Sequence, residues 1–454
     1  MCKAVQKWQR LDIHQRFEQT DTGRLFASKL GQVEMDDFRV VHSGLDTVRQ
    51  LYKGQIKGEV LAEVVRLYTE RTGELMGLGG HVWLVRSGGK SGYQYMLQNS
   101  DTGLIVFLKS RFTEATDEGS HVKIECSPHW IHPRPIEQVA TELDRLAACL
   151  LHAPAGCGVA VHICADIQGW NPAAREVGEG SGFLERLKTR ARRLVSHKSN
   201  NVEYFDIGEV GMQYGQNQSY LLGSASSVQL AVYRKELEAT AKDKLHFWEH
   251  LWQQAVHEDD FTKPAYSPDE PVWRVEFRFH QSVLEQFARG FEQQQMQARD
   301  GCLYSGLLDD WTHIRGVSER LTGLWRYGLE NYRLEVTAHG YGRYYDPAWQ
   351  ILIEDVIHGS PSGDFLFKRV PKKPGEGNTK NLMLAVGNLL SCYARNRFTP
   401  EHAMNCLKAS GIYDDLHRYM FNRACSRHQT MPDDAIWDFV SKGLQVRTLL
   451  GKAA

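Results

Sequence analysis

Tyrosine and carboxylate side chains occupy comparable places in three strand-like segments of the sequence. In segment 228–233 the side chains alternate, so Tyr233 ends the segment on its less apolar face. Segment 273–279, WRVEFRF, alternates in the same way and places Glu276 on its polar face. The segment VAVHICAD places its last residue, Asp166, on its less apolar face. If the three segments share a sheet, one wet face holds a tyrosine and two carboxylates.

Such a face suits attack of a phenol on a phosphodiester. A carboxylate pair can hold Mg²⁺ or Mn²⁺, which prefer oxygen ligands and polarise a phosphate. A nearby cation such as Lys235 would lower the pKa of the phenol from about 10. A tyrosyl phosphodiester conserves the energy of the broken bond, so a DNA 3′-OH can reverse the step. The alternative is structural: Tyr233 is a half-buried strand aromatic, and Glu276 pairs with Arg274 or Arg278.

The motifs around the tyrosine resemble those of one family. Tyr220 and Gly223 precede the run Val-Tyr-Arg-Lys at 232–235, and Glu238 follows it. A Trp-Arg-Val-Glu strand comes next, at 273–276, and the strands HSGLD and HICAD lie upstream. In order and approximate spacing these motifs resemble the Rep_trans family of rolling-circle replication initiators, carried by plasmids and filamentous phages.

The resemblance, which covers residues 36–290, implies a role for each matching residue. Tyr233 would be the nucleophile that becomes joined to the DNA 5′-phosphate, and Lys235 would assist the phosphate. Asp166 and Glu276 would be ligands of Mg²⁺ or Mn²⁺, with Asp46 as a third candidate. The chain would nick one strand at an origin, in a hairpin or single-stranded region, and later rejoin it.

Two positions depart from the family pattern. Arg234 stands where the family usually has Asn or Asp, and His162 stands at the first of two positions that are often acidic. The change at His162 supports an alternative without catalysis, in which the protein binds a specific DNA sequence and keeps the fold but not the metal site.

The expected fold class is α+β. The pattern predicts a curved, mixed, largely antiparallel sheet with flanking helices, followed by a mostly helical C-terminal region. The expected domains are an N-terminal arm (1–35), the nickase core (36–299) and a helical region (300–454) for DNA binding or partner contact. The uncharged stretch 146–165 is long enough for a membrane span, but Pro154 and two glycines indicate a helix end, a turn and a buried strand.

DNA contacts are expected from basic clusters, because the whole chain has a formal net charge of −1. Segment 184–198 has six Lys or Arg in fifteen residues and predicts an amphipathic helix with one basic face, although an ordinary solvated helix would have the same pattern. Region 368–397 is also basic. The arginines expected to contact DNA are Arg186, Arg190, Arg193, Arg234, Arg274 and Arg278.

Other features limit the compartment and the partners. Nine cysteines without a CxxC pair, and an N-terminus without an apolar run, indicate the reducing cytoplasm of a bacterium. The P-loop-like run 88–91 has Leu84 where its first glycine is required, so no motor is expected. The initiator would then need a host helicase, a DNA polymerase and a single-strand binding protein. A homodimer would supply a second tyrosine, and no membrane partner is expected.

A second metal motif competes with this interpretation. His246, Glu249 and His250 match the H-x-x-E-H pattern of some zinc hydrolases, and a helix would place the two histidines on one face. No third ligand can be identified, and two surface histidines are the simpler interpretation. His129 and His132 are separated by two residues, so they do not form the His-hydrophobic-His clamp of the other large class of tyrosine nickases.

Overall fold

The chain forms two compact units, Met1–Val370 and Pro371–Ala454. The computed structural model describes residues 14–20, 23–28, 30–70, 74–88, 92–172, 182–189, 194–195, 204–205, 219–223, 228–256, 265–297, 309–337, 344–359, 369–370, 379–425 and 432–449. Each unit has its own hydrophobic core among these residues.

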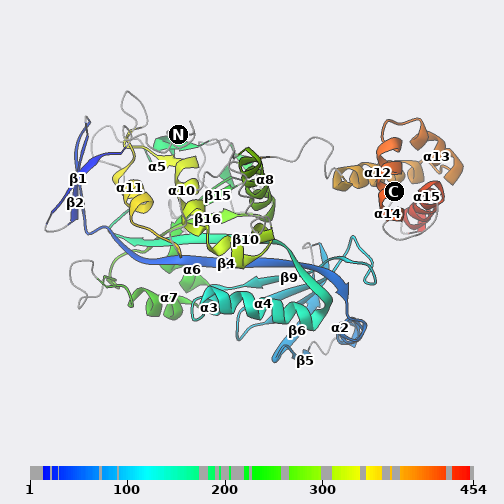
Figure 1. Cartoon of the computed structure of the whole chain (residues 1–454), viewed down its shortest axis with the longest axis horizontal. Helices are drawn as coiled ribbons and strands as arrows, with labels where there is room; N and C mark the ends of the chain where they lie inside the picture. Colours follow the sequence, from blue (N-terminus) through cyan, green and yellow to red (C-terminus); the bar gives the residue numbers. More distant parts are fainter. Residues whose placement is uncertain are drawn as a thin grey trace. The chain divides into compact units, whose positions relative to one another are not determined.

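A large antiparallel sheet is the centre of the first unit (Figure 1). Within the described ranges its strands are, in spatial order, β13 (Tyr204–Phe205), β12 (Leu194–Val195), β14 (Ser219–Leu222), β15 (Val228–Arg234), β16 (Trp273–Phe279), β10 (Leu151–Gln168), β4 (Arg39–Ile56), β9 (Gly119–Cys126), β8 (Leu104–Ser110), β7 (Tyr93–Asn99), β6 (His81–Ser87) and β5 (Glu74–Leu78). The expected α+β class, with a large antiparallel sheet and flanking helices, is confirmed. The sheet is not closed.

Strands β4 and β10 are the longest and lie side by side through the first unit (Figure 1). Alternation along β10 buries Val161, Ile163 and Ala165 in the main core, so His162 and Asp166 point to the opposite face. The turn expected near Pro154 is absent from this described strand. Instead β10 continues through irregular pairing with β4 between His152 and Gly158.

Helices cover the core face of the sheet. They are α2 (Gly58–Glu70), α4 (Ile136–Leu150), α8 (Gln281–Gln297), α9 (Ile314–Ser318), α10 (Leu321–Asn331) and α11 (Pro347–Glu354), with the 3₁₀ turn η1 (Asp309–Thr312). In α4 the buried residues Val139, Leu143 and Leu150 recur at helical spacing, which defines one apolar face. Among the short helices, α3 (Pro128–Ile131) follows β9, and α6 (Lys235–Ala241) and then α7 (Leu245–Trp252) follow β15.

The basic helix predicted for 184–198 is wrong over its described part. Helix α5 (Phe183–Arg186) is one turn long, and strand β11 (Leu187–Thr189) follows it and pairs with β17 (Tyr332–Leu334). The partner strand lies far along the chain, so tertiary pairing has overridden the local helical pattern. Arg190 and Arg193 lie outside the described residues.

The unit boundaries differ from those expected. The described part of the predicted arm forms a three-stranded sheet of β1 (Arg16–Gln19), β2 (Gly23–Ser28) and β3 (Gly31–Asp36). The segment after residue 300 contributes Ile314, Trp325 and Trp349 to the main core, so the first unit extends to Val370. Continuous burial, rather than the change from strands to helices, sets this boundary.

The second unit is helical. Its described helices are α12 (Thr379–Arg395), α13 (Pro400–Lys408), α14 (Tyr413–Cys425) and α15 (Pro432–Leu449). Its core includes Val386, Leu407 and Val440. Across the described parts of both units, no helix is long and apolar enough to cross a membrane.

Candidate functional site

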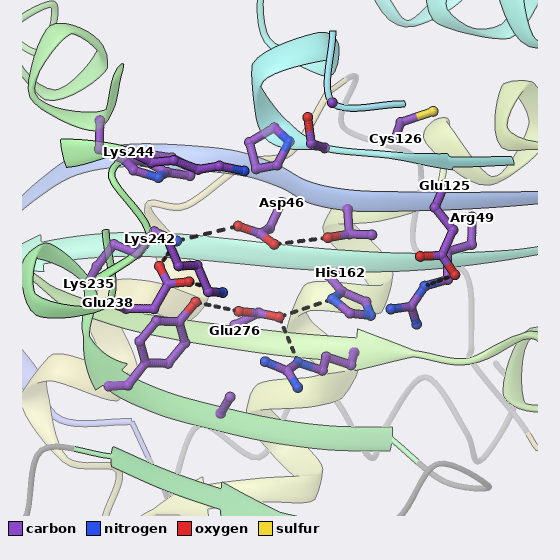
Figure 2. Close-up of a pocket in the computed structure, with 18 of the residues that line it drawn as sticks. Asp46, Arg49, Glu125, Cys126, His162, Lys235, Glu238, Lys242, Lys244 and Glu276 are labelled. Atoms are coloured by element: carbon purple, nitrogen blue, oxygen red, sulfur yellow. Dashed lines mark hydrogen bonds and ion pairs between the residues drawn. The ribbon is translucent and has the colours of Figure 1, made fainter. Parts of the chain in front are cut away.

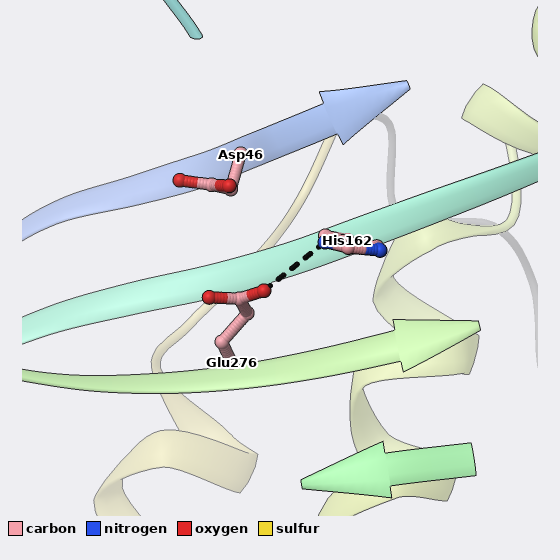
Figure 3. Close-up of side chains that lie close together, drawn as sticks. All are labelled: Asp46, His162 and Glu276. Atoms are coloured by element: carbon pink, nitrogen blue, oxygen red, sulfur yellow. Dashed lines mark ion pairs between the residues drawn. The ribbon is translucent and has the colours of Figure 1, made fainter. Parts of the chain in front are cut away.

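Three ligand-type side chains meet on the face of the sheet opposite the main core (Figure 3). Asp46 comes from β4, His162 from β10 and Glu276 from β16. One ligand atom from each lies within 4.8 Å of the others. Two of these residues, Glu276 and Asp46, were expected as metal ligands, whereas His162 was noted only as a departure from the family pattern.

A bulge in β4 directs Asp46 to this face. Thr47 pairs with His162 and Leu45 pairs with Ile163, so Asp46 is an extra residue between two paired positions. Leu45 is buried in the main core, and the bulge changes which side chains of β4 face it. A regular strand would not place Asp46 and Thr47 together opposite one residue of β10.

Glu276 contacts three other side chains of the site. Its Oε2 accepts a hydrogen bond from the Tyr233 hydroxyl at 2.8 Å. Its Oε1 accepts one from Arg278 Nε at 2.7 Å and lies 3.1 Å from His162 Nδ1. The pairing of Glu276 with Arg278 confirms that part of the structural alternative, and the contact with Tyr233 places the expected nucleophile at the ligand cluster.

The charges of the site favour ionised carboxylates and a protonated phenol. Burial alone would raise the pKa of Glu276, but Arg278 and His162 hold it well below its usual range. Burial and Glu276 also oppose ionisation of Asp46, yet Arg274 and Lys235 lower its pKa. Burial and the neighbouring Glu276 raise the pKa of Tyr233 well above its ordinary value. The pair of negative charges suits a cation, and the phenol needs a proton acceptor before it can attack.

Asp166 does not join the ligand cluster, contrary to the prediction. Its carboxylate accepts from Arg274 Nε at 2.6 Å and Nη2 at 2.7 Å, and from Trp252 Nε1 at 2.8 Å. Arg274 also donates through Nη1 to Asp46. Arg274 and Asp166 are both fully buried, so solvent does not reach the part of this sheet face where they lie, although the whole face was expected to be solvated. Asp166 therefore holds Arg274, and Arg274 holds Asp46.

Lys235 begins α6 beside the cluster. Its Nζ lies 2.6 Å from Glu238 Oε2 and 3.8 Å from Asp46 Oδ1. The ring of Trp248, on α7, contacts two cations, with its centroid 4.4 Å from Lys235 Nζ and 4.1 Å from Arg274 Cζ. The sequence predicted Lys235 at the site, but it gave no reason to place Trp248 there.

The ligand cluster lines a pocket of about 450 Å³ together with Tyr233, Lys235 and Trp248. Figure 2 shows Asp46, His162 and Glu276 in its middle, with Lys235 and Glu238 on one side and Arg49 and Glu125 on the other. Two further lysines line it that sequence reasoning missed, Lys242 and Lys244. The only available signal was their position just after the tyrosine strand and its short helix.

The arginines expected to contact DNA are placed differently. Arg186 is 6% exposed and donates from Nη1 to Asp346 at 2.6 Å, so it is not available to a phosphate. Arg274 is buried and is not available either. Arg234 pairs with Glu236 and remains partly exposed, and Arg278 lines the pocket.

The zinc motif does not assemble a metal site among the described residues. The side chain of His246 is fully exposed and faces Glu249, from the same helix, at 3.7 Å. His250 contacts Gln254, one turn further along the chain. The ligand group that the described residues do form is Asp46, His162 and Glu276. These positions favour the simpler interpretation, surface histidines.

Comparisons with known proteins give one clear relationship. No family model matches the chain. The chain is 32% identical to the uncharacterized protein ORF430 of Pseudomonas phage Pf1 over 438 residues, which cover 91% of this chain and 94% of the phage protein. The chain therefore belongs to the same family as ORF430 of this phage.

Proposed function

We propose that the chain is a site-specific DNA nickase and strand transferase that initiates rolling-circle replication, with Tyr233 as its nucleophile. The observation that supports this most strongly is the 2.8 Å hydrogen bond from the Tyr233 hydroxyl to Glu276, at a cluster of three metal-ligand side chains. The presence of a relative in a Pseudomonas phage is compatible with this function, because a phage is a replicating genetic element. The resemblance to Rep_trans initiators adds the order of the motifs.

Asp46, His162 and Glu276 would hold the divalent cation. A bound cation would polarise the scissile phosphate and offset the charge of the transition state. Two carboxylates alone suit Mg²⁺, but an imidazole nitrogen is a softer ligand. We therefore expect the site to prefer Mn²⁺ to Mg²⁺.

The residues of the chain would divide the remaining work. Tyr233 directs its proton at Glu276 Oε2, which accepts it as the phenol oxygen bonds to phosphorus. The bond from phosphorus to the DNA 3′-oxygen breaks, and this oxygen leaves as a hydroxyl after taking up a proton from water, to which Glu276 then releases the proton that it accepted. Lys235 and Arg278, which line the pocket, would offset the charge of the phosphate oxygens. The reverse sequence would reseal the strand.

Formation of a covalent adduct tests the nucleophile. The wild-type protein with Mn²⁺ and single strands of its own genetic element should give a protein–DNA adduct that survives SDS. Tyr233→Phe should abolish the adduct, whereas Tyr220→Phe, which changes another tyrosine of the same pocket, should retain it. An adduct that persists in Tyr233→Phe would exclude Tyr233 as the nucleophile.

A binding protein without catalysis is the second candidate. The observation that favours it is that Arg278 and His162 already contact the Oε1 atom of Glu276 and partly satisfy its charge. This candidate predicts intact DNA binding, no adduct on any strand and no response to Mn²⁺.

Metal preference is tested by replacing the imidazole. In His162→Asp, three carboxylates would surround the site, so the preference should move from Mn²⁺ towards Mg²⁺. The measurement is the concentration of each metal that gives half-maximal adduct, together with the metal-induced shift in Tm. Equal responses of the wild type and His162→Asp to both metals would show that His162 is not a ligand.

A further inference from the structure

The face of the sheet that holds the site continues beyond it onto strands β9, β8, β7 and β6. Cross-strand pairing defines two adjoining rows of side chains on this face. The first row is Arg49, Glu125, Ile105, Gln98 and Leu84. The second row is Leu51, Lys123, Phe107, Met96 and Arg86. We call these ten residues the β6–β9 face.

This face points away from the main core. Alternate residues of the same strands, such as Trp83, Leu97 and Val106, are buried in the main core, together with residues of α2 and α4. On the β6–β9 face, Leu84, Met96 and Ile105 are partly exposed, although they are apolar. Val82, the next residue of β6 in this direction, is 47% exposed. Apolar side chains on a solvent-accessible sheet face indicate a contact surface.

The charges of the face suit a polyanion. Arg49, Lys123 and Arg86 are basic, and Glu125 is the one acid in the two rows. Lys123 Nζ lies 4.0 Å from the centroid of the Phe107 ring and 2.8 Å from Glu125. Glu125 also lies 3.2 Å from Arg49 Nε, and Figure 2 shows this pair at the end of the pocket. Two cations are thus held in place on the face by a single carboxylate.

The face is continuous with the candidate site. Arg49, Glu125 and Ile105 belong to the first row and also line the pocket that contains Tyr233 and the ligand cluster. From β4 to β6 there are four strand spacings, or about 19 Å. That width would accommodate on the order of five nucleotides of a stacked strand.

We propose that the β6–β9 face binds the DNA single strand that enters the site, with phosphates at Arg49, Lys123 and Arg86 and unpaired bases on Leu84, Met96 and Ile105. The proposal rests on the proposed function, because it names where the substrate of that reaction lies. A single strand fits better than a duplex, since the apolar side chains can contact only bases that are not covered by a complementary strand.

Binding without reaction tests the proposal. The full chain with Tyr233→Phe, in EDTA, would be titrated against a fluorescein-labelled 20-nucleotide single strand of mixed sequence. Adding Arg86→Glu and Lys123→Glu should weaken binding at least tenfold and reduce the slope of log K against log salt by about 1.4, for two lost phosphate contacts. The matched control is Arg66→Glu with Arg145→Glu, on α2 and α4, which pack on the core face of the sheet. The control should bind within twofold of the parent, and equal affinity of both double variants would overturn the proposal.

A variant that should bind the single strand more tightly distinguishes the proposal from a loss of binding caused by misfolding. Glu125→Gln removes the acid that Arg49 and Lys123 share, so it should tighten single-strand binding about threefold or more, which a misfolded protein would not do. Unchanged or weaker binding in this variant would contradict the proposal. A duplex of the same sequence should bind more weakly, and equal or tighter duplex binding would also contradict it.

The adduct assay separates this proposal from the proposed function. If the wild type forms the Tyr233 adduct but Arg86→Glu with Lys123→Glu binds normally, the nickase is supported and the binding face is wrong. If the charge reversals weaken binding but no strand gives an adduct, the face binds DNA and the nickase is wrong.

Discussion

Arg274 determines which carboxylates can serve the site. It forms two hydrogen bonds with Asp166 and a third with Asp46, and it is itself fully buried. Both oxygens of Asp166 are thereby committed to an ion pair, whereas Arg274 contacts only the Oδ1 atom of Asp46, whose Oδ2 accepts a hydrogen bond from the Thr47 hydroxyl at 3.0 Å. A buried guanidinium of this kind is stable only while its carboxylate partners remain.

Asp166→Asn should therefore lower the free energy of unfolding markedly and change the affinity for Mn²⁺ little. Removing one partner of a buried ion pair leaves an uncompensated charge, so we expect a loss of about 3 kcal/mol in the free energy of unfolding. Glu270→Gln is the control, because Glu270 pairs with Arg39 where its side chain is 39% exposed, and it should cost less than about 1 kcal/mol. Denaturant unfolding and Mn²⁺ titration give the two quantities. A stable Asp166→Asn protein that no longer binds Mn²⁺ would restore Asp166 as a ligand.

His358 should make the first unit sensitive to acid. It is 4% exposed, its Nε2 has no hydrogen-bond partner, and burial lowers its pKa from 6.5 to about 3. The unfolded chain therefore binds a proton that the folded chain does not, and the stabilisation is complete above pH 6.5 and is lost as the pH falls towards 3. At pH 4.5 this loss amounts to about 2–3 kcal/mol.

The prediction is tested by the pH dependence of unfolding. Between pH 7 and pH 4.5, His358→Gln should lose about 2–3 kcal/mol less than the wild type. His246→Gln, at a fully exposed histidine, should have the pH dependence of the wild type. Parallel curves for His358→Gln and the wild type would show that His358 is already protonated in the folded protein, or that it does not titrate in this range.

At the scale of elements, strand alternation predicted more of the site than helical patterning did. In WRVEFRF, the alternate residues Val275 and Phe277 are buried in the core and Glu276 lies on the site face, as the sequence predicted. For β4 the same rule was insufficient. Asp46 reaches the site only through a bulge, and no residue type in HSGLD specifies where a bulge falls.

The prediction of a basic helix over 184–198 was wrong for a different reason. The residues of this segment fit a helix with one basic face, but Arg186 meets Asp346, 160 positions further along the chain. A local pattern contains no information about so distant a partner. The same limit explains why Trp248 was not predicted at the site, since its contacts with Lys235 and Arg274 form only when α7 packs on the sheet.

Packing between α10 and β16 reverses the usual effect of a helical glycine. Alanine normally stabilises a helix interior by up to about 1 kcal/mol over glycine. A Cβ at Gly328 would lie 2.7 Å from the ring of Phe277, so Gly328→Ala should instead destabilise the first unit by about 1–3 kcal/mol. Gly387→Ala in α12 is the control, because its Cβ would meet Arg447 at an ordinary 3.5 Å. Calorimetry of both variants gives the sign, and a stabilised Gly328→Ala would show that the ring moves freely away.

At the scale of the whole molecule, the chain divides into two compact units rather than the three regions expected from the pattern, and among the described residues each unit has its own main core. Trp325 and Trp349 belong to the same core as the sheet, although they follow the residue-300 boundary that the sequence indicated. The second core, around Leu390, Leu416 and Ile436, consists of residues of the C-terminal helices. Units with separate cores should unfold separately.

A chain that ends at Val370 should therefore keep the first unit intact. We expect calorimetry of the full chain to show two unfolding transitions. The shortened chain should keep the transition that Gly328→Ala shifts.

The fragment 371–454 alone should show the circular dichroism of a helical protein with cooperative unfolding, because its described helices supply their own core. The shortened chain should also still form the Tyr233 adduct at saturating DNA, since the described residues that line the site all lie before residue 280. A single transition in the full chain, together with an unfolded fragment, would mean that the C-terminal helices depend on the sheet for their stability.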